Sequence, residues 1–280
     1  MKDKRILCTG GAGSIGSELV RQLAPDNQIY VHDINETAMF DLVEELRLKG
    51  HNVIGRLGDV KDRDNLMSVF LEFAPHIVFN CAALKHVTPS MWTPREYVKT
   101  NVLGTLNQLE LAREYGTPKF INVSTDKAVD ADNIMGWTKR GTEMLTRIYG
   151  GISVRFGNVM GSRGSVIPIW QKQIEEGLPL TITDKRMERY MMTIPEACEL
   201  IIEAAKGEPG DIYIMDMGEQ VNVLGLAQDI LNKSGRKSGV KMIGIRPGEA
   251  LVETLMSEKE KKIAIRKGKF YVIKENRNKE

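Results

Sequence analysis

Residues 5–16 read RILCTGGAGSIG, which is a short apolar strand, a glycine-rich turn and the start of an amphipathic helix. In such a segment Gly10 permits the tight turn, Gly13 lets a phosphate approach the backbone, and Gly16 lets the helix pack closely on the strand. The start of the helix also presents free N–H groups and the positive end of its dipole to phosphate oxygens. The spacing therefore predicts a dinucleotide site, and the alternative is a glycine-rich turn that binds nothing.

Acidic residues after the next two strands complete this site. Asp33 ends the second strand, about twenty residues after the glycines, where a carboxylate accepts hydrogen bonds from an adenosine ribose. Because a 2′-phosphate would meet a like charge there, Asp33 favours NAD, although Arg56 leaves NADP open. Asp59 and Val60 follow the third strand and suit the adenine edge. The cofactor contacts expected at these strand ends are Gly10, Gly13, Ser14, Ile15, Gly16, Asp33, Ile34, Asp59 and Val60.

Strands and helices alternate through the first two-thirds of the chain. Short apolar runs such as Gln28–His32, Ile77–Phe79 and Lys119–Val123 are separated by amphipathic segments, the longest from about Arg95 to Tyr115. This alternation implies a parallel sheet covered by helices on both faces and joined by right-handed crossovers. The predicted fold class is α/β, a doubly wound parallel (Rossmann) sheet with a small C-terminal α/β substrate-binding cap.

The alternation of strands and helices becomes less regular after Gly157, and we place the expected domain boundary there. We expect residues 1–157 to form the NAD-binding core, with contributions from later segments, and residues 158–280 to form mostly the substrate-binding cap. Helices are predicted in the later part at 164–176, Pro195–Lys206 and Leu224–Leu231, with strands at Leu180–Thr183 and Asp211–Met215. The remainder is expected to be short and irregular.

Composition places the chain among ordinary globular proteins. It is 42% hydrophobic and 27% charged with a formal net charge of +2, so no surface for nucleic acid is expected. No apolar run approaches the ~20 residues of a membrane helix. Met1–Arg5 leads straight into a strand, which leaves no room for a signal peptide. We therefore expect a cytoplasmic protein without membrane contact.

Neither the cysteines nor the histidines have the spacing of metal ligands. The three cysteines stand in apolar contexts, as small buried side chains in a reducing compartment do, and the four histidines are scattered. No metal site is therefore predicted. The residues concerned are Cys8, Cys81, Cys198, His32, His51, His76 and His86.

Six segments together resemble the extended short-chain dehydrogenase/reductase superfamily. More narrowly, they are similar to the nucleotide-sugar 4,6-dehydratases of bacterial polysaccharide biosynthesis that act on UDP-N-acetylglucosamine. The glycine turn alone indicates only a dinucleotide, whereas Lys-His after Ala-Ala, together with Thr-Asp-Lys, is much narrower. The matching segments, in the order of the family, are residues 9–18, 80–87, 99–105, 124–129, 135–140 and 246–249.

The resemblance departs from the family pattern at the usual proton carrier. A tyrosine is expected four residues before Lys139, and this sequence has Met135, whose thioether cannot carry a proton. A branch of the family shares this methionine, which packs in the core or shapes the sugar pocket. The resemblance implies that Asp126 and Lys127 supply the acid and base instead, with Lys139 orienting the nicotinamide ribose and Ala82 and Ala83 lining the cofactor site. The alternative for Lys139 is a solvated helix lysine.

Dehydration of a hexose across C5–C6 needs temporary oxidation at C4, which acidifies the C5 proton. We hypothesise that Asp126 accepts the O4 proton and later protonates O6. Lys127 is expected to be the C5 base, and Thr125 to bond O4. The catalytic residues implied by the resemblance are thus Thr125, Asp126, Lys127 and Lys139.

Candidate substrate contacts lie on several later segments. Lys85 and His86 follow a strand end and reach toward nicotinamide or sugar, the alternative being a histidine that caps the next helix. Arginine recognises diphosphate oxygens in a bidentate manner, and the alternative for each arginine here is a surface salt bridge. Thr181 lies in a strand whose backbone is expected to read the base. The full predicted set is Lys85, His86, Asn158, Thr181, Arg189, Arg246 and Glu249.

The function implied by the resemblance is that of a lyase. It is an NAD-dependent UDP-N-acetylglucosamine 4,6-dehydratase that forms a UDP-4-keto-6-deoxy-N-acetylhexosamine with retention at C5. Three alternatives stay open: a C5-inverting dehydratase, a nucleotide-sugar 4-epimerase, and a non-catalytic NAD-binding regulator. The expected partner is the UDP-sugar, and because relatives are dimers or larger, the resemblance also implies a homo-oligomer.

Overall fold

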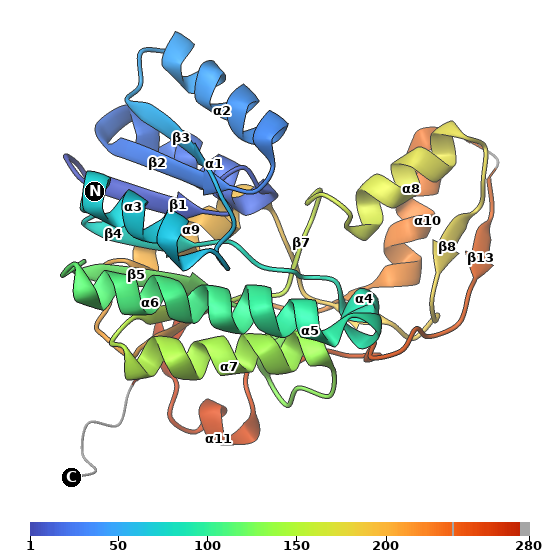
Figure 1. The fold of residues 1–280 in the computed structure, drawn as a ribbon. Coiled ribbons are helices and arrows are strands. Elements are labelled where there is room, and N and C mark those ends of the chain that lie inside the picture. Colours follow the sequence, from blue (N-terminus) through green and yellow to red (C-terminus); the bar gives the residue numbers. More distant parts are fainter. Residues whose placement is uncertain (237, 275–280) are drawn as a thin grey trace.

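A computed structural model describes residues 1–236 and 238–274, and its centre is a nine-stranded sheet (Figure 1). The seven strands from β3 to β11 in the spatial order are parallel, and β15 and β14 add an antiparallel edge. The chain reverses direction across the sheet between β1 and β4, as in a doubly wound fold. The order is β14 (Ile265–Lys267), β15 (Phe270–Ile273), β11 (Ile212–Met215), β6 (Ile152–Arg155), β5 (Lys119–Val123), β4 (Ile77–Asn80), β1 (Arg5–Thr9), β2 (Gln28–Asp33) and β3 (Val53–Leu57).

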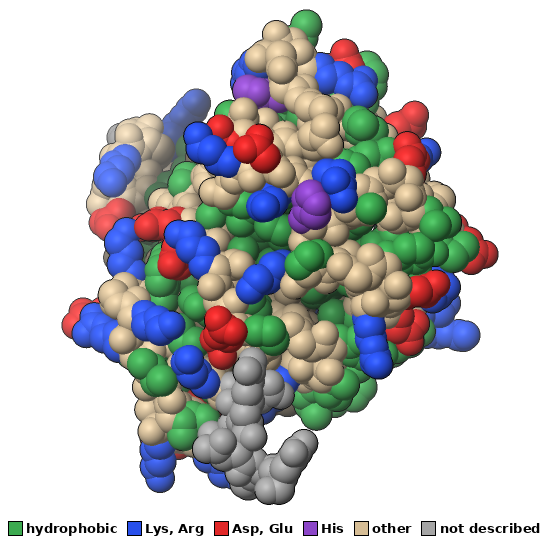
Figure 2. Space-filling model, turned by 90° about the vertical axis from the view of Figure 1, so that its left-hand side faces the viewer, with side chains coloured by type: hydrophobic (Ala, Val, Ile, Leu, Met, Phe, Trp, Pro, Cys, Tyr) green, Lys and Arg blue, Asp and Glu red, His purple; other side chains and the backbone are tan. Residues whose placement is uncertain are grey.

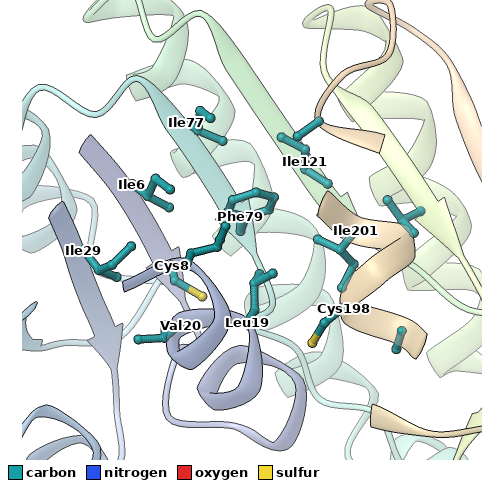
Figure 3. Close-up of a cluster of buried hydrophobic side chains, with 14 of the residues drawn as sticks. Ile6, Cys8, Leu19, Val20, Ile29, Ile77, Phe79, Ile121, Cys198 and Ile201 are labelled. Carbon is teal, nitrogen blue, oxygen red and sulfur yellow. The ribbon is translucent and has the colours of Figure 1, made fainter. Parts of the chain in front are cut away.

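Helices cover both faces of this sheet, which confirms the predicted α/β class. Alternate residues of β1 pack into different cores: Ile6 and Cys8 on one face and Leu7 on the other. Figure 3 shows the first core, where Leu19 and Ile201 from two helices meet the strand side chains. That face carries α1 (Ser14–Leu23), α2 (Glu36–Leu48) and α9 (Ile194–Ala204); the other carries α3 (Arg63–Phe73), α6 (Gly104–Glu114) and α7 (Ile134–Ile148).

The predicted long helix around residues 95–115 is divided in the structure. It begins as α5 (Pro94–Tyr97), continues through a π-helical segment η2 (Val98–Leu103), and then becomes α6. A π segment widens the turn, and such segments occur frequently at functional sites. Here it contains the buried Asn101. The shorter elements of the core are η1 (Ala24–Asp26), α4 (Val87–Trp92) and η3 (Asp126–Ala128).

A smaller cluster lies beyond the carboxyl ends of the strands, on the right in Figure 1. Its centre is the fully buried Trp170, which packs with Leu180 and Ala227. The elements around this second core are α8 (Val166–Glu175), β8 (Leu180–Ile182), α10 (Val223–Ser234) and β13 (Val240–Met242). Short strand pairs connect it to the sheet: β7 (Asn158–Val159) with β10 (Met191–Met192), and β9 (Glu188–Arg189) with β12 (Val221–Asn222).

The elements after Leu231 are short, as expected, but the chain there is not irregular throughout. Strand β13 pairs with β8, and the hairpin of β14 and β15 extends the central sheet beside β11. Gly268 makes the hairpin turn with a positive φ of 59°. A short helix, α11 (Glu258–Lys261), precedes the hairpin and begins with a capping box between Ser257 and Glu260.

The face formed by the amino ends of the strands lies opposite the cap. Figure 2 shows lysine and arginine side chains interspersed there with acidic and apolar ones. Within residues 1–236 and 238–274, no helix combines the length and the apolar character needed to cross a bilayer.

Candidate active site

The glycine turn between β1 and α1 can accept a dinucleotide only because side chains are missing from it. Gly10 has a φ of +64°, and a Cβ on it would lie 2.6 Å from the backbone nitrogen of Ala82. A Cβ on Gly16 would collide with the carbonyl oxygen of Gly10. Gly13 caps α1 without a side-chain hydrogen bond, so the N–H groups at the start of α1 are available to a phosphate.

Asp33 lies beside this turn at the end of β2, where it was predicted to bind a ribose. Its Oδ2 accepts from the backbone N–H of Ala12 at 2.9 Å, and its Oδ1 accepts from Asn35 at 2.8 Å. An ionised carboxylate offers about four acceptor positions, so two remain for ribose hydroxyls. Arg56 on β3 forms an ion pair with Glu72 on α3 and does not contact Asp33.

The other predicted cofactor residues lie at the same edge of the sheet. Ile34 is exposed next to Asp33, and Val60 is buried against Gly104. Asp59 accepts from the backbone N–H of Lys61 at 2.9 Å. The backbone at Ala82, followed by Ala83 after β4, lies against Gly10 of the glycine turn. These positions fit a dinucleotide.

A segment that the sequence analysis did not single out crosses the glycine turn. The backbone N–H of Arg163 donates to Ser14 Oγ at 2.9 Å, and its guanidinium donates to the carbonyl oxygen of Ala12. One residue earlier, Ser162 Oγ accepts from Lys85 Nζ at 3.3 Å. Partial desolvation lowers the pKa of Lys85, and the Arg163 guanidinium lowers it further. Cofactor turn and predicted substrate residues therefore meet at residues 161–165.

His86 lies under the same segment. It occupies the N-cap position of α4 but makes no side-chain capping bond, so its ring is not a helix cap. A Cβ on Gly164 would lie 3.0 Å from the ring carbon Cε1 of His86. Desolvation, together with the neighbouring Lys85, lowers the pKa of His86 and favours the neutral ring.

The predicted acid and base stand at the carboxyl end of β5. Asp126 is 0% exposed, and its backbone N–H donates to the carbonyl oxygen of Phe156 at 3.0 Å. Thr125 Oγ1 donates to Asp126 Oδ1 at 2.8 Å, so the hydroxyl expected to bond the sugar O4 also orients this carboxylate. The other carboxylate oxygen of Asp126 is buried without a hydrogen-bond partner in the protein. A buried oxygen without a partner is uncommon in folded proteins, and a ligand donor that reached it would satisfy it.

Lys127 is surrounded by acceptors. Its Nζ lies 3.0 Å from Asp126 Oδ1, 3.1 Å from Asn158 Oδ1 and 3.7 Å from Glu253 Oε1. Asn158 was predicted to contact the substrate, and in the structure its amide oxygen accepts from this lysine. Glu253 was not predicted.

Lys139 lies beneath the same strand. It is 7% exposed, and its Nζ donates to the carbonyl oxygen of Val123 at 2.5 Å. This burial rules out a solvated helix lysine and lowers the pKa of Lys139 to about 8. Four residues earlier, Met135 is 2% exposed, and its backbone N–H donates to Ser90 Oγ.

Asn101 joins the π-helical segment to the strand end that carries Lys85. Its side chain accepts from the N–H of Leu84 at 2.8 Å and donates to the carbonyl oxygen of Leu84 at 3.0 Å. It also donates to Thr138 Oγ1 on α7 at 2.9 Å. One amide thus fixes the loop after β4 against the helix that carries Lys139.

A buried ionic network lies next to the turn that carries Thr125 and Asp126. Arg155 at the end of β6 is fully buried and forms bidentate contacts with Glu143 and Glu260, the closest being 2.7 Å. Glu143 also accepts from Ser124 Oγ at 2.7 Å, directly before Thr125. The Arg140 guanidinium supplies the second positive charge, 3.4 Å from Glu260 and 3.9 Å from Glu143. Because two guanidinium groups then face two carboxylates, the network can be buried without an isolated ion.

The remaining predicted substrate residues are already engaged within the protein. The N–H of Thr181 donates to Gln173 and its carbonyl accepts from Trp170, so its backbone would have to release both partners to read a base. Arg189 is buried and donates to the carbonyl oxygens of Glu188, Leu251 and Ala250 rather than facing solvent. Among the residues that the structure describes, no three His, Cys, Asp or Glu side chains gather closely enough to hold a metal ion.

Arg246 and Glu249 form one turn near α4. Their side chains approach to 3.9 Å, and the Arg246 guanidinium is half exposed. Gly248 between them has a φ of +78°, and a Cβ there would lie 3.0 Å from both Asn133 and Val87. The turn therefore packs against the start of α7.

The whole arrangement matches one family of proteins. A family model described as "Polysaccharide biosynthesis protein" covers residues 6–275. The chain belongs to this family. The probable polysaccharide biosynthesis protein EpsC of Bacillus subtilis (strain 168) is 43% identical over 277 residues, which are 93% of this chain and 46% of EpsC. The chain thus spans about half the length of that curated relative.

Two solved structures share the fold. The X-ray structure of Pen from Bacillus thuringiensis superimposes with a TM-score of 0.94 at 33% identity, covering 99% of this chain and 90% of Pen. The UDP-glucose 4-epimerase of Thermus thermophilus, solved as a complex with NAD, gives a TM-score of 0.79 at 26% identity and covers 91% of each chain.

Proposed function

We propose that this polysaccharide biosynthesis protein is an NAD-dependent UDP-N-acetylglucosamine 4,6-dehydratase. The observation that carries the proposal is the ion pair of the buried Asp126 with Lys127, whose side chain is 15% exposed, just after β5, together with the buried Lys139 and Met135 of α7. An epimerase needs a proton carrier only for O4. A dehydratase also needs an acid for O6 and a base for C5, which an adjacent carboxylate and amine can supply.

NAD is proposed as the cofactor for two reasons. The glycine turn has room for a dinucleotide because its glycines carry no side chains, and the Asp33 carboxylate can accept further hydrogen bonds. Gly10, Gly13 and the start of α1 would hold the pyrophosphate, and Asp33 the adenosine ribose. Lys139 would bond the nicotinamide ribose. The NAD found in the Thermus epimerase supports this assignment. When bound, NAD supplies the chemistry of removing a hydride from C4 and returning it to C6.

The protein's own residues then move the protons. Asp126 takes the O4 proton on its unpartnered carboxylate oxygen as C4 is oxidised to the ketone. Lys127 takes the C5 proton, and the proton held by Asp126 leaves with the C6 hydroxyl as water. Lys127 finally returns its proton to C5. All protons are accounted for, and a substrate in this position would be shielded by the segment 161–165.

Retention at C5 is proposed because one base that takes and returns the proton acts on one face of the sugar. Inversion would require a second proton donor on the opposite face. Proton NMR of the product distinguishes the two, since the couplings of the C5 proton differ between the epimeric sugars.

The proposed function is tested by mass spectrometry of UDP-N-acetylglucosamine incubated with the protein and NAD. Loss of one water is the expected result. A 4-epimerase, which the likeness to the Thermus enzyme keeps as the second candidate, would leave the mass unchanged. In D₂O, deuterium enters C5 only in the dehydratase. NAD binding without any turnover of the sugar would instead favour a non-catalytic regulator.

A further inference from the structure

Glu253 stands in the reacting part of the site although no motif points to it. It lies between the turn at residues 246–249 and α11, and its side chain is 11% exposed. Its Oε1 is 3.7 Å from Lys127 Nζ and 3.9 Å from Arg189 Nη2. A carboxyl group this deeply placed beside the proposed C5 base calls for a chemical account.

The segment that carries Glu253 is held on both sides. Arg189 donates to the carbonyl oxygens of Ala250 at 2.7 Å and Leu251 at 2.9 Å. Gln220 Nε2 donates to the carbonyl oxygen of Glu253 itself at 2.8 Å. The position of the carboxyl group relative to Lys127 is therefore set by the fold rather than by a free loop.

The surroundings of Glu253 combine two positive and two negative groups. Burial raises the pKa of Glu253, which means that its protonated form is easier to reach than in water. Lys127 and Arg189 act in the opposite direction, and Asp126 and Asp132 add to the increase. In this site the protonated form of Glu253 is therefore an alternative to its carboxylate form.

A protonated Lys127 cannot act as a base, and Glu253 offers a place for its extra proton. An ammonium has three N–H donors and no acceptor, and the Lys127 nitrogen faces three acceptors, on Asp126, Asn158 and Glu253. That environment suits the ammonium form, which cannot take the C5 proton. The base must therefore lose a proton within the site before C5 reacts.

We propose that Glu253 is the group that takes this proton. Because 3.7 Å is longer than a hydrogen bond, the transfer needs the Lys127 side chain to move to within about 3 Å of Glu253 or one water to bridge the two groups. The N–H bond of the Lys127 ammonium then breaks and an O–H bond forms on Glu253, so an ion pair becomes an amine and a carboxylic acid with no change in net charge. The proton returns to Lys127 after C5 has been reprotonated. Glu253 thus acts through Lys127, and the inference rests on the proposed dehydratase function.

Replacing Glu253 by Gln tests this role, because the amide keeps the size of the side chain but cannot hold the proton. We expect kcat at neutral pH to fall about 10²-fold, a typical contribution of one acid–base group, with KM for the UDP-sugar unchanged. The loss should shrink as the pH is raised toward ~10, where solvent deprotonates a lysine directly. Glu253→Asp keeps a carboxyl group but places it one methylene further away. Its kcat at neutral pH should lie between that of wild type and that of Glu253→Gln. The matched control is Glu188→Gln, an exposed carboxylate on β9, which should leave the profile unchanged.

Two outcomes separate the inference from the proposed function. If the wild-type protein removes no water from the sugar, the proposed function fails. If it does so and Glu253→Gln lowers kcat by the same factor at every pH, Glu253 is only structural and the inference is overturned. Should Glu253→Gln not fold, judged by thermal unfolding, the profile of Glu253→Asp decides: partial recovery at alkaline pH supports the proton transfer, and a profile parallel to wild type refutes it.

Discussion

The site has two halves that the chain builds in different ways. The cofactor half consists of the glycine turn at residues 10–16 and Asp33, which lie on adjacent parallel strands near the amino terminus. The reacting half consists of Asp126, Lys127, Asn158 and Glu253, which come from η3 after β5, from β7 and from a loop before α11. The first half depends on short-range backbone shape, and the second on long-range placement of charge. Variants should therefore separate the two functions cleanly.

The largest effect is expected from Asp126→Asn, which removes the proton carrier of the reacting half and keeps its shape. We expect kcat to fall about 10²–10⁴-fold while NAD affinity is unchanged. Steady-state rates of water loss and a separate NAD titration measure the two halves independently. Near-normal dehydration would remove the proposed role of Asp126, and a parallel loss of NAD affinity would show that the halves are not separable.

The same contrast explains how much of the fold the sequence predicts. The parallel core follows from local patterns, because β1 alternates residues between two apolar cores and β4 begins with three consecutive apolar residues, Ile77–Phe79. Strand β6 was not recognised because Ser153 and Arg155 interrupt its apolar pattern. The structure buries Arg155 by pairing it with Glu143 and Glu260, more than a hundred residues apart in one case. No local pattern reveals such compensation.

Prediction of the site meets the same limit. The glycine turn, Asp33 and Asp126 could be named from motifs because each chemical role lies within one short segment. Glu253 could not, since its position depends on Arg189 holding a loop 61 and 62 residues away in the chain. Arg163 was also missed, and only its place between Gly161 and Gly164 hints at a close approach to another backbone.

Lys139 connects the two halves. We expect Lys139→Met to bind NAD more weakly and to be more stable than wild type at neutral pH. Burial lowers the pKa of Lys139 from 10.5 to about 8. Between these values the unfolded chain holds a proton that the folded chain does not, so this lysine makes stability rise with pH across that window. Below it the buried ammonium costs up to about 3 kcal/mol, which the methionine avoids.

Urea unfolding at neutral pH and near pH ~10 measures this difference. The variant should be more stable than wild type at neutral pH, with the gap closing at alkaline pH, and its NAD affinity should fall. Lys172→Met, an exposed lysine on α8, is the control and should show neither change. A variant that is less stable at both pH values would mean that the bond from Lys139 to Val123 outweighs the cost of burial.

Gly10→Ala should damage the cofactor half alone. The new Cβ combines a positive φ with a clash against the Ala82 backbone, so we expect a loss of about 1–3 kcal/mol in the free energy of unfolding together with weaker NAD binding. Gly116→Ala is the matched control, because Gly116 has a φ of +65° but open space around it. Equal losses in the two variants would show that backbone strain, and not the close approach to β4, sets the need for glycine at position 10.

The smallest effect is expected from Asp33→Asn, which tests the cofactor half without changing the reacting half. The amide oxygen still accepts hydrogen bonds from the ribose hydroxyls, but such a bond contributes about 0.5–1.5 kcal/mol where a bond to a charged acceptor contributes about 1.5–3 kcal/mol, so NAD affinity should fall roughly tenfold. The affinity for NADP should fall less, because the like charge facing its 2′-phosphate is also removed, and the preference between the two should narrow. Because Asp33 lies far from the transferred protons, kcat at saturating NAD should not change. Titration of both cofactors against the variant and wild type measures the preference directly. An unchanged ratio of the two affinities would mean that Asp33 only ties Ala12 and Asn35 to the end of β2, and that another group selects the cofactor.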